Sequence, residues 1–285
     1  MIEISLWEQL AAFAEEGTLS KAAEKLHTSQ PALTRAMKKL EIELGIPLFH
    51  RTKNRISPND TGRLAAFLAR QLLEQDKDLV RRLKAYDRSL RTISLGCCAP
   101  VPQMVLAPMI NNLYEGMTIS TDMKNDCDFP ARLLDGTYQL TVTHYPLDKA
   151  EFCCRKCGKE QLFLSVPPDS SLAFYPEIRL SDLDGLSVLL FFRIGFWMEM
   201  VKEKAPRAHF MLMVQRSSFT ELVEHSAYPC FSSSYFINRG EMSARRVNIP
   251  IADEESRTSY YLSCLKENGK RFAPLFGQMR EDAIS

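Results

Sequence analysis

Side chains that can bind DNA bases and phosphates gather between residues 29 and 38. Gln can form a bidentate hydrogen-bonded pair with adenine and Arg with guanine, so we expect Gln30, Thr34 and Arg35 to contact base edges or phosphates. Hydroxyl and ammonium groups more often hold the phosphate backbone, as we expect of Ser29 and Lys38. With two arginines further along the chain, the predicted DNA-contact residues are Ser29, Gln30, Pro31, Thr34, Arg35, Lys38, Arg51 and Arg55.

The element that must present these side chains is a helix with an apolar opposite face. Apolar residues at helical spacing predict a helix over residues 4–16, a short helix capped by Thr18, and a third helix from Pro31 to the glycine at position 45. The polar segment at residues 27–29 is a turn between the last two. Two helices joined by such a turn form a helix-turn-helix, whose second helix enters the major groove.

Two further elements follow. Residues 49–57 predict two short extended pieces around a basic tip, a wing that lies against phosphates or the minor groove. From about Asp60 to Arg88 the pattern predicts one long helix with more apolar positions than an isolated helix would carry, so a dimer seam is its natural partner. These positions are Leu64, Phe67, Leu68, Leu72, Leu79, Leu83 and Tyr86.

The charge distribution agrees with a phosphate-facing N-terminus. Residues 21–63 carry nine Lys or Arg and four acidic residues, an excess of five, while the whole chain has a formal net charge of +1. The remainder is therefore net acidic, at 1 − 5 = −4. By charge alone, a solvated charged face would explain the excess equally well.

From Thr92 onward short strands and helices alternate, which predicts an α/β domain with largely parallel sheets. The chain length of 285 residues suits two or three packed units. The predicted strands cover residues 92–96, 118–123, 140–143, 162–166 and 188–192, and the predicted helices cover residues 106–114, 131–134 and 270–282.

Eight cysteines are expected to be reduced thiols, because no secretory signal begins the sequence and no stretch is apolar enough to span a membrane. We therefore expect a cytoplasmic location. Cys154 and Cys157 have a metal-ligand or redox spacing, but no second pair follows, so we expect a reduced, partly buried loop there. A redox or metal role for this pair or for Cys97 and Cys98 stays open, and the sequence predicts neither a metal site nor a cofactor.

Residues 17–35 and 39–51, from Gly17-Thr18-Leu19-Ser20-Lys21-Ala22-Ala23 to Pro47-Leu48-Phe49-His50-Arg51, closely resemble the DNA-binding signature of LysR-type transcriptional regulators. The resemblance implies a winged helix-turn-helix, a long linker helix and a two-subdomain α/β domain like the type 2 periplasmic binding proteins. It weakens after the wing: residues 56–62 depart from the usual linker start, Gln139 replaces an Asp before a strand, and residues 227–230 replace a Gly-rich turn.

By this resemblance the DNA-binding domain covers residues 1–58, the linker helix residues 59–90 and the regulatory domain residues 91–285. Subdomain I would comprise residues 91–161 and 265–285, and subdomain II residues 162–264. Family members bind small effectors between the two subdomains, at strand-to-helix turns that favour anions. The effector-contact residues that we expect are Cys97, Cys98, Ala99, Pro100, Val101, Thr143, His144, Phe192, Arg193 and Ser217.

The resemblance predicts a regulator that binds double-stranded operator DNA and a small-molecule effector. It would assemble into a dimer through the linker helix and then into a tetramer, with RNA polymerase as a further candidate partner and no membrane association. An anionic or polar effector suits Arg193, whereas the aromatic residues around it suit an apolar one. One alternative stays open, in which the C-terminal domain only assembles the oligomer and senses no ligand.

Two other classes are disfavoured. An enzyme is not predicted, because the sequence holds no nucleophile elbow, phosphate loop or metal dyad. A free periplasmic solute-binding protein would not carry the basic N-terminal module.

Overall fold

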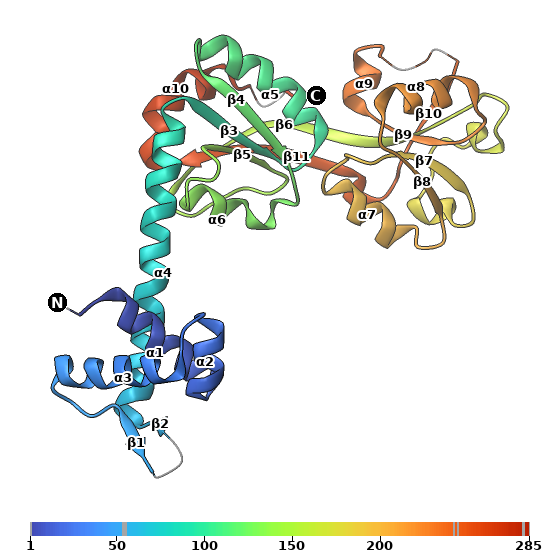
Figure 1. The fold of residues 1–285 in the computed structure, drawn as a ribbon. Helices are drawn as coiled ribbons and strands as arrows, with labels where there is room; N and C mark the ends of the chain where they lie inside the picture. The colour runs from blue at the N-terminus through green and yellow to red at the C-terminus, as the bar shows by residue number, and fades with distance from the viewer. Residues whose placement is uncertain (1, 53–55, 242, 244, 281–282, 285) are drawn as a thin grey trace. The chain divides into compact units, whose positions relative to one another are not determined.

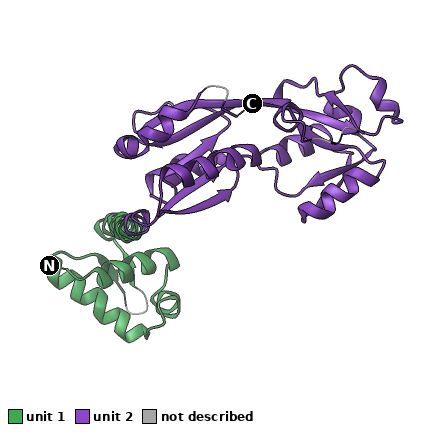
Figure 2. Cartoon of the chain, turned by 90° about the horizontal axis from the view of Figure 1, so that it is seen from above, with its two compact units in different colours: residues 1–84 green, residues 85–285 purple. Residues whose placement is uncertain are grey.

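The chain forms two compact units in a computed structural model (Figure 2). One unit covers Met1–Lys84 and the other Ala85–Ser285. No described helix combines the length and the apolar composition that a membrane crossing requires. The structure describes residues 2–52, 56–241, 243, 245–280 and 283–284.

The first unit is built on the predicted helices, each ended by a clear local signal. Gly17 and Gly45 end the first and third helix with φ angles of 70° and 71°, a left-handed conformation that glycine adopts without steric cost. The side-chain oxygens of Thr18 and Ser29 each accept a backbone N–H and cap the following helices. The helices are α1 (Ile4–Glu16), α2 (Leu19–Lys25) and α3 (Gln30–Leu44).

The predicted wing is present as a two-stranded antiparallel ribbon (Figure 1). Strand β1 (Phe49–Arg51) pairs with β2 (Ile56–Pro58). The ring of Phe49 lies 5.6 Å from that of Phe13 on α1, so the wing is fixed to the core of this unit. The tip of the wing, with Arg55, lies outside the described residues.

The long helix is α4 (Asp60–Ser89), with bounds close to those predicted. Asn59 precedes it and accepts the N–H of Gly62 at 2.7 Å, so the N-cap persists although the local sequence departs from the family pattern. Gly62 is required by packing, because a Cβ there would lie 2.1 Å from the carbonyl oxygen of Leu48.

The first half of the second unit has parallel strands joined by helices. Strand β3 (Thr92–Cys97) lies between β4 (Thr118–Met123) and β5 (Leu140–Thr143), and both pairings are parallel. The connecting helices are α5 (Pro100–Leu113) and α6 (Phe129–Leu134). Helix α5 begins earlier than predicted, since prolines fit a first helical turn.

The second half repeats this arrangement. Strand β7 (Ser187–Phe191) lies between β8 (His209–Met213) and β9 (Cys230–Ser233), again in parallel. The remaining elements here are α7 (Trp197–Lys204), α8 (Arg216–His225), α9 (Ser234–Asn238) and β10 (Val247–Pro250). Short 3-10 helices occupy Asp126–Asp128 (η1), Ser171–Phe174 (η2), Leu180–Leu183 (η3), Glu254–Ser256 (η4) and Lys266–Asn268 (η5).

Two long strands cross between the halves, and here the prediction of largely parallel sheets is wrong. Strand β6 (Phe152–Val166) pairs antiparallel with β11 (Arg257–Leu265), and these strands also pair antiparallel with β5, β9 and β10. The expected loop at the cysteine pair is therefore part of β6, with a bulge in the pairing at Cys157. The last helix is α10 (Gly269–Gln278), which is shorter than the predicted helix.

Candidate DNA-recognition helix and ligand cleft

Helix α3 presents the predicted base-contact residues to solvent. Leu33, Met37 and Leu40 are buried on its opposite face, whereas Gln30 and Arg35 are exposed. Ser20 on α2 donates a hydrogen bond of 3.0 Å to the side-chain oxygen of Gln30 and so orients it. Gln30, Pro31, Thr34 and Arg35 together line a shallow surface hollow. Sequence analysis did not single out Ser20, which lies in the first turn of α2, the helix before the recognition helix.

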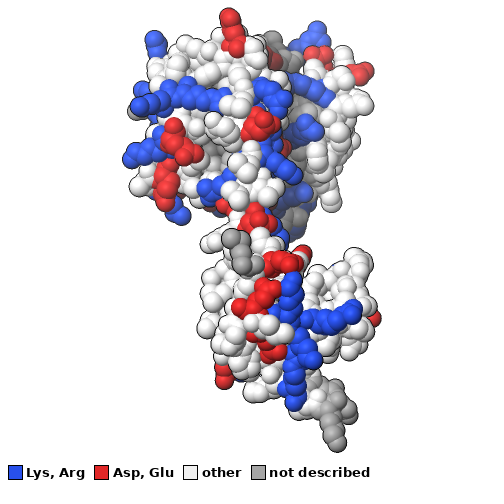
Figure 3. All heavy atoms as spheres, turned by 60° about the vertical axis from the view of Figure 1, so that its left-hand side comes forward, with Lys and Arg blue, Asp and Glu red and all other residues white. Residues whose placement is uncertain are grey.

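Part of the basic excess in this unit is neutralised internally. Lys25, Lys39 and Arg51 form ion pairs with nearby glutamates at 3.0, 2.7 and 2.7 Å, and Figure 3 shows blue and red side chains side by side on the face in view. Among the described residues no ion pair involves Arg35 or Lys38. The uncompensated positive charge therefore lies beside the base-contact residues of α3, where phosphates would neutralise it.

Arg51 has a structural partner as well as a predicted DNA role. Its guanidinium donates to Glu41 at 2.7 Å, and the same carboxylate accepts the backbone N–H groups of Leu48 and Phe49. Burial alone would raise the pKa of Glu41, but the arginine and the two N–H groups outweigh it and lower that pKa. Glu41 thus anchors the wing to α3 and keeps Arg51 at its base.

Helix α4 carries an apolar stripe without a partner in the described chain. Leu68, Leu72 and Leu79 are 52%, 40% and 57% exposed. The stripe follows helical spacing, and contiguous exposed apolar surface of this kind marks an interaction site. Its other members are Leu64, Phe67, Leu83 and Tyr86.

A polar cleft of about 590 Å³ lies between the two halves of the second unit. The segment from Thr121 to Asn125, at the end of β4, forms one wall, and Phe192, Arg193 and Glu199 belong to the other. Asn125 donates a hydrogen bond of 2.9 Å to Glu199 across the cleft. Among the described residues no ion pair involves Arg193.

A second, apolar cavity of about 240 Å³ lies on the other side of the segment that follows β7. Leu189, Phe219 and Phe231 contribute apolar walls, and Arg216 and Pro100 also line it. Of the aromatic residues that the sequence places around Arg193, Phe192 and Phe196 line the polar cleft with it, whereas Phe191 lines the apolar cavity.

The predicted effector-contact residues do not all meet at one site. Phe192 and Arg193 line the polar cleft and Pro100 lines the apolar cavity. Thr143 is buried and donates to the carbonyl of Tyr145, and the exposed Ser217 lines neither space. Cys97, Cys98, Ala99 and Val101 are core residues, and His144 packs beside them.

The sequence analysis did not predict the cleft wall at the end of β4, although the rule that parallel strands gather ligands at their carboxyl ends applies to β4 as well.

The family profile of bacterial regulatory helix-turn-helix proteins of the LysR family matches residues 4–63, and the LysR substrate-binding-domain profile matches residues 87–282. This chain belongs to the LysR family. LysR-family members are DNA-binding transcriptional regulators, and the two matches contain the recognition helix and both cavities.

Several regulators of the LysR type are similar over different lengths. A RuBisCO operon transcriptional regulator from Allochromatium vinosum is 24% identical over 282 residues, which cover 96% of this chain and 93% of that regulator. An uncharacterized HTH-type transcriptional regulator from Bacillus subtilis is 25% identical, and the match covers 62% of this chain but only 56% of that protein. The Hca operon transcriptional activator from Escherichia coli is 25% identical over 65% of this chain and 64% of its own length.

Solved LysR-family structures share the fold. Vibrio fischeri DarR in complex with DNA covers 98% of this chain and 100% of its own, with 17% identity and a TM-score of 0.53. A full-length OxyR variant from Pseudomonas aeruginosa has the same coverage and identity, with a TM-score of 0.51. These similarities support the winged helix-turn-helix and the two-part α/β domain.

Proposed function

We propose that this LysR-family regulator recognises an operator through base contacts from Gln30, Thr34 and Arg35, with Lys38 and Ser29 on phosphates. The observation that carries the proposal is the exposed polar face of α3, where Arg35 and Lys38 have no counter-charge among the described residues. Arg51 and Arg55 would add phosphate or minor-groove contacts from the wing. The protein would act in the cytoplasm, where operator DNA is, as a regulator and not as an enzyme.

The exposed stripe of α4 supports a dimer through paired linker helices. A dimer would present two recognition helices to a partly palindromic operator. We further propose that dimers assemble into a tetramer and that the bound regulator contacts RNA polymerase. We also propose that the DNA-binding domain ends at residue 58, the linker helix at residue 90, and the first segments of subdomains I and II at residues 161 and 264. Strands β6 and β11 would connect the two subdomains.

The effector would be a small polar metabolite with a carboxylate. Its place would be the polar cleft, where the guanidinium of Arg193 offers a planar pair of donors. Glu199 lines the same cleft. A ligand with a hydrogen-bond donor beside its carboxylate would therefore pair its carboxylate with Arg193 and its donor with Glu199.

Selection of a binding sequence from random DNA tests the operator proposal. The wild-type full-length chain should enrich a sequence with two related half-sites, and Arg35→Ala should lose the preference at one position of each half-site. Lys39→Ala is the matched control, because Lys39 lies on the same helix but is paired with Glu3. A wild-type chain that enriches no sequence would refute the proposal.

Calorimetry with carboxylate metabolites tests the effector proposal. Arg193→Lys should weaken a carboxylate ligand about tenfold, because a charge-assisted bidentate contact is lost. Arg216→Lys, which changes the lining of the apolar cavity, is the control. Binding only of neutral, apolar ligands, sensitive to Arg216 and not to Arg193, would assign the effector to the other cavity.

A further inference from the structure

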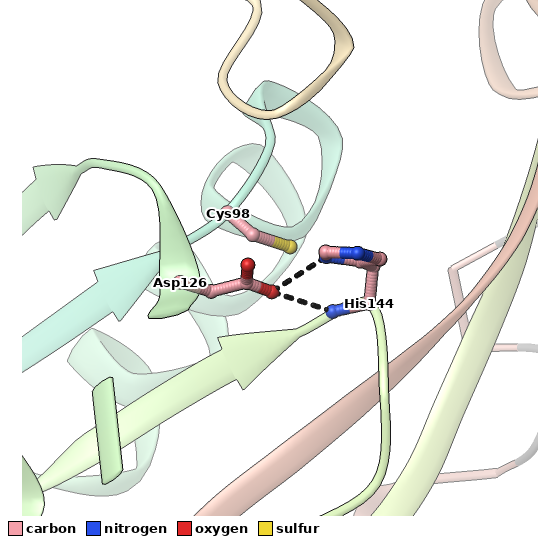
Figure 4. A group of neighbouring side chains, drawn as sticks. All are labelled: Cys98, Asp126 and His144. Carbon is pink, nitrogen blue, oxygen red and sulfur yellow. Dashed lines mark hydrogen bonds and ion pairs between the residues drawn. The ribbon is translucent and has the colours of Figure 1, made fainter. Parts of the chain in front are cut away.

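Three loops at one end of the first half-sheet bring a thiol, a carboxylate and an imidazole together (Figure 4). Cys98 follows β3, Asp126 begins η1 and His144 follows β5. One ligand atom of each side chain lies within 4.8 Å of the other two. Of these residues, sequence analysis had selected Cys98 and His144 but not Asp126.

Asp126 is a buried carboxylate with no Lys or Arg partner among the described residues. It is 1% exposed, and its Oδ2 atom lies 2.9 Å from the backbone nitrogen and 2.7 Å from the Nδ1 atom of His144. Among the described residues no Lys or Arg forms an ion pair with it. Burying a carboxylate is costly unless a positive charge compensates it, so this position favours a bound cation.

We propose that Cys98, Asp126 and His144 bind one divalent zinc-class ion. Sulfur, nitrogen and oxygen donors together suit Zn²⁺ and similar transition metals, whereas Mg²⁺ and Ca²⁺ prefer oxygen donors only. In a tetrahedral zinc site the ligand atoms lie about 3.4 to 3.8 Å apart, and one ligand atom from each of these three residues already lies within 4.8 Å of the others. Three protein ligands leave one position for water or a ligand group.

The surroundings disfavour a redox-sensing role for Cys98. Its side chain is buried, whereas redox-sensing cysteines are accessible to solvent. A bound metal would convert this thiol to the thiolate and release its proton to solvent.

The site also lies against the second half of the unit. The imidazole of His144 stacks on Phe196 with ring centroids 4.4 Å apart and an angle of 4°, and the backbone N–H of Phe196 donates to the carbonyl of Cys98 at 2.9 Å. An ion on His144 would therefore steady the contact between the two halves beside the polar cleft. This consequence for regulation rests on the proposed effector function, whereas the metal site itself does not.

Titration of the chelator-treated full-length protein with Co²⁺ tests the site. Co²⁺ bound by a thiolate gives a sulfur-to-metal charge-transfer absorption, and we expect this band to saturate at one Co²⁺ per chain. Cys98→Ser should abolish the band. Cys127→Ser is the matched control, because Cys127 is exposed and adjoins Asp126 in η1, and it should keep the band.

A second variant guards against a folding defect in Cys98→Ser. His144 has a 37% exposed side chain, so His144→Gln should fold, as circular dichroism without metal would check. It should weaken Zn²⁺ binding about tenfold or more in competition with a chelator. A thiolate band that persists in Cys98→Ser, or Zn²⁺ affinity unchanged in His144→Gln, would overturn the proposal. The assay needs no DNA or effector, so its failure leaves the proposed function untouched, and failure of operator binding leaves the cobalt result standing.

Discussion

Substitutions of single side chains on α3 should distinguish base contacts from phosphate contacts. Gln30→Ala and Arg35→Ala should each reduce the preference for operator over random DNA by about 1 to 3 kcal/mol, because each removes a bidentate base contact. Lys38→Ala should weaken both kinds of DNA by a similar factor, because phosphates carry no sequence information. Competition binding with labelled operator measures both effects. An equal loss on both DNAs in Arg35→Ala would make Arg35 a phosphate contact.

Glu160 is a buried acid at the crossing of β6 and β11. The hydroxyl of Tyr260 donates to its carboxylate, and burial raises the pKa of Glu160. The folded state therefore holds this proton more tightly than the unfolded state, so the stabilisation is complete below the unfolded pKa and is lost as the pH rises through the folded pKa.

Glu160→Gln should remove this pH dependence and raise the free energy of unfolding near neutral pH by on the order of 1 kcal/mol. Thermal unfolding between acidic and neutral pH measures it, with the exposed Glu151→Gln as control. If the variant unfolds more easily at every pH, the carboxylate is an essential acceptor and the expected gain is wrong.

At the residue scale, the sequence predicts functional residues that lie at regular spacing on one element. Gln30 and Arg35 were found because one helix carries them. Asp126 was not, since its role depends on residues 98 and 144 and on folding that buries it. Gln139, noted only as a departure from the family, accepts the backbone N–H of Ser94 at 2.7 Å in the core. Such long-range contacts have no local signal.

At the element scale, α4 should hold the dimer together. Leu72→Glu would place a charge without a partner in the apolar seam and should weaken the dimer about a hundredfold or more, an effect of about 3 kcal/mol. Sedimentation of the full-length chain over a concentration series measures this. Gln75→Glu, an exposed charge change on the same helix, should leave the dimer intact. An undisturbed dimer in Leu72→Glu would mean that another surface assembles the protein.

Element boundaries were predictable where the periodicity was clear and a glycine or a cap marked the end, as in α1 and α3. Strand β6 was found only in its last part. Its earlier segment contains Lys156 and Lys159, a residue type that strands mildly disfavour, and the bulge at Cys157 interrupts the alternation. Because β6 gains its stability from pairing with β11, about a hundred positions later in the chain, local sequence could not show it.

At the scale of the whole molecule, the two halves of the second unit meet through the segment that follows β7. Gly195 has a φ of 65°, and a Cβ there would lie 1.8 Å from the carbonyl oxygen of Cys98. This close approach allows the N–H of Phe196 to reach the same carbonyl. The sequence predicted two subdomains with a cleft between them, but it could not show that one glycine fixes their contact.

Gly195→Ala should therefore break this local contact between the halves while leaving DNA recognition by α3 unchanged. The added methyl group cannot be accommodated against the Cys98 backbone, so the amide of Phe196 should exchange its hydrogen at least tenfold faster, which corresponds to about 1.4 kcal/mol of lost protection. Gly185→Ala is the matched control, because Gly185 has a φ of 83° but no atom within 4 Å of the added Cβ. It carries the same backbone strain without the clash. Hydrogen exchange measured by mass spectrometry on both variants isolates the steric effect from the strain. Equal exchange at Phe196 in the two variants would mean that the close approach of Gly195 to Cys98 does not fix the contact between the two halves.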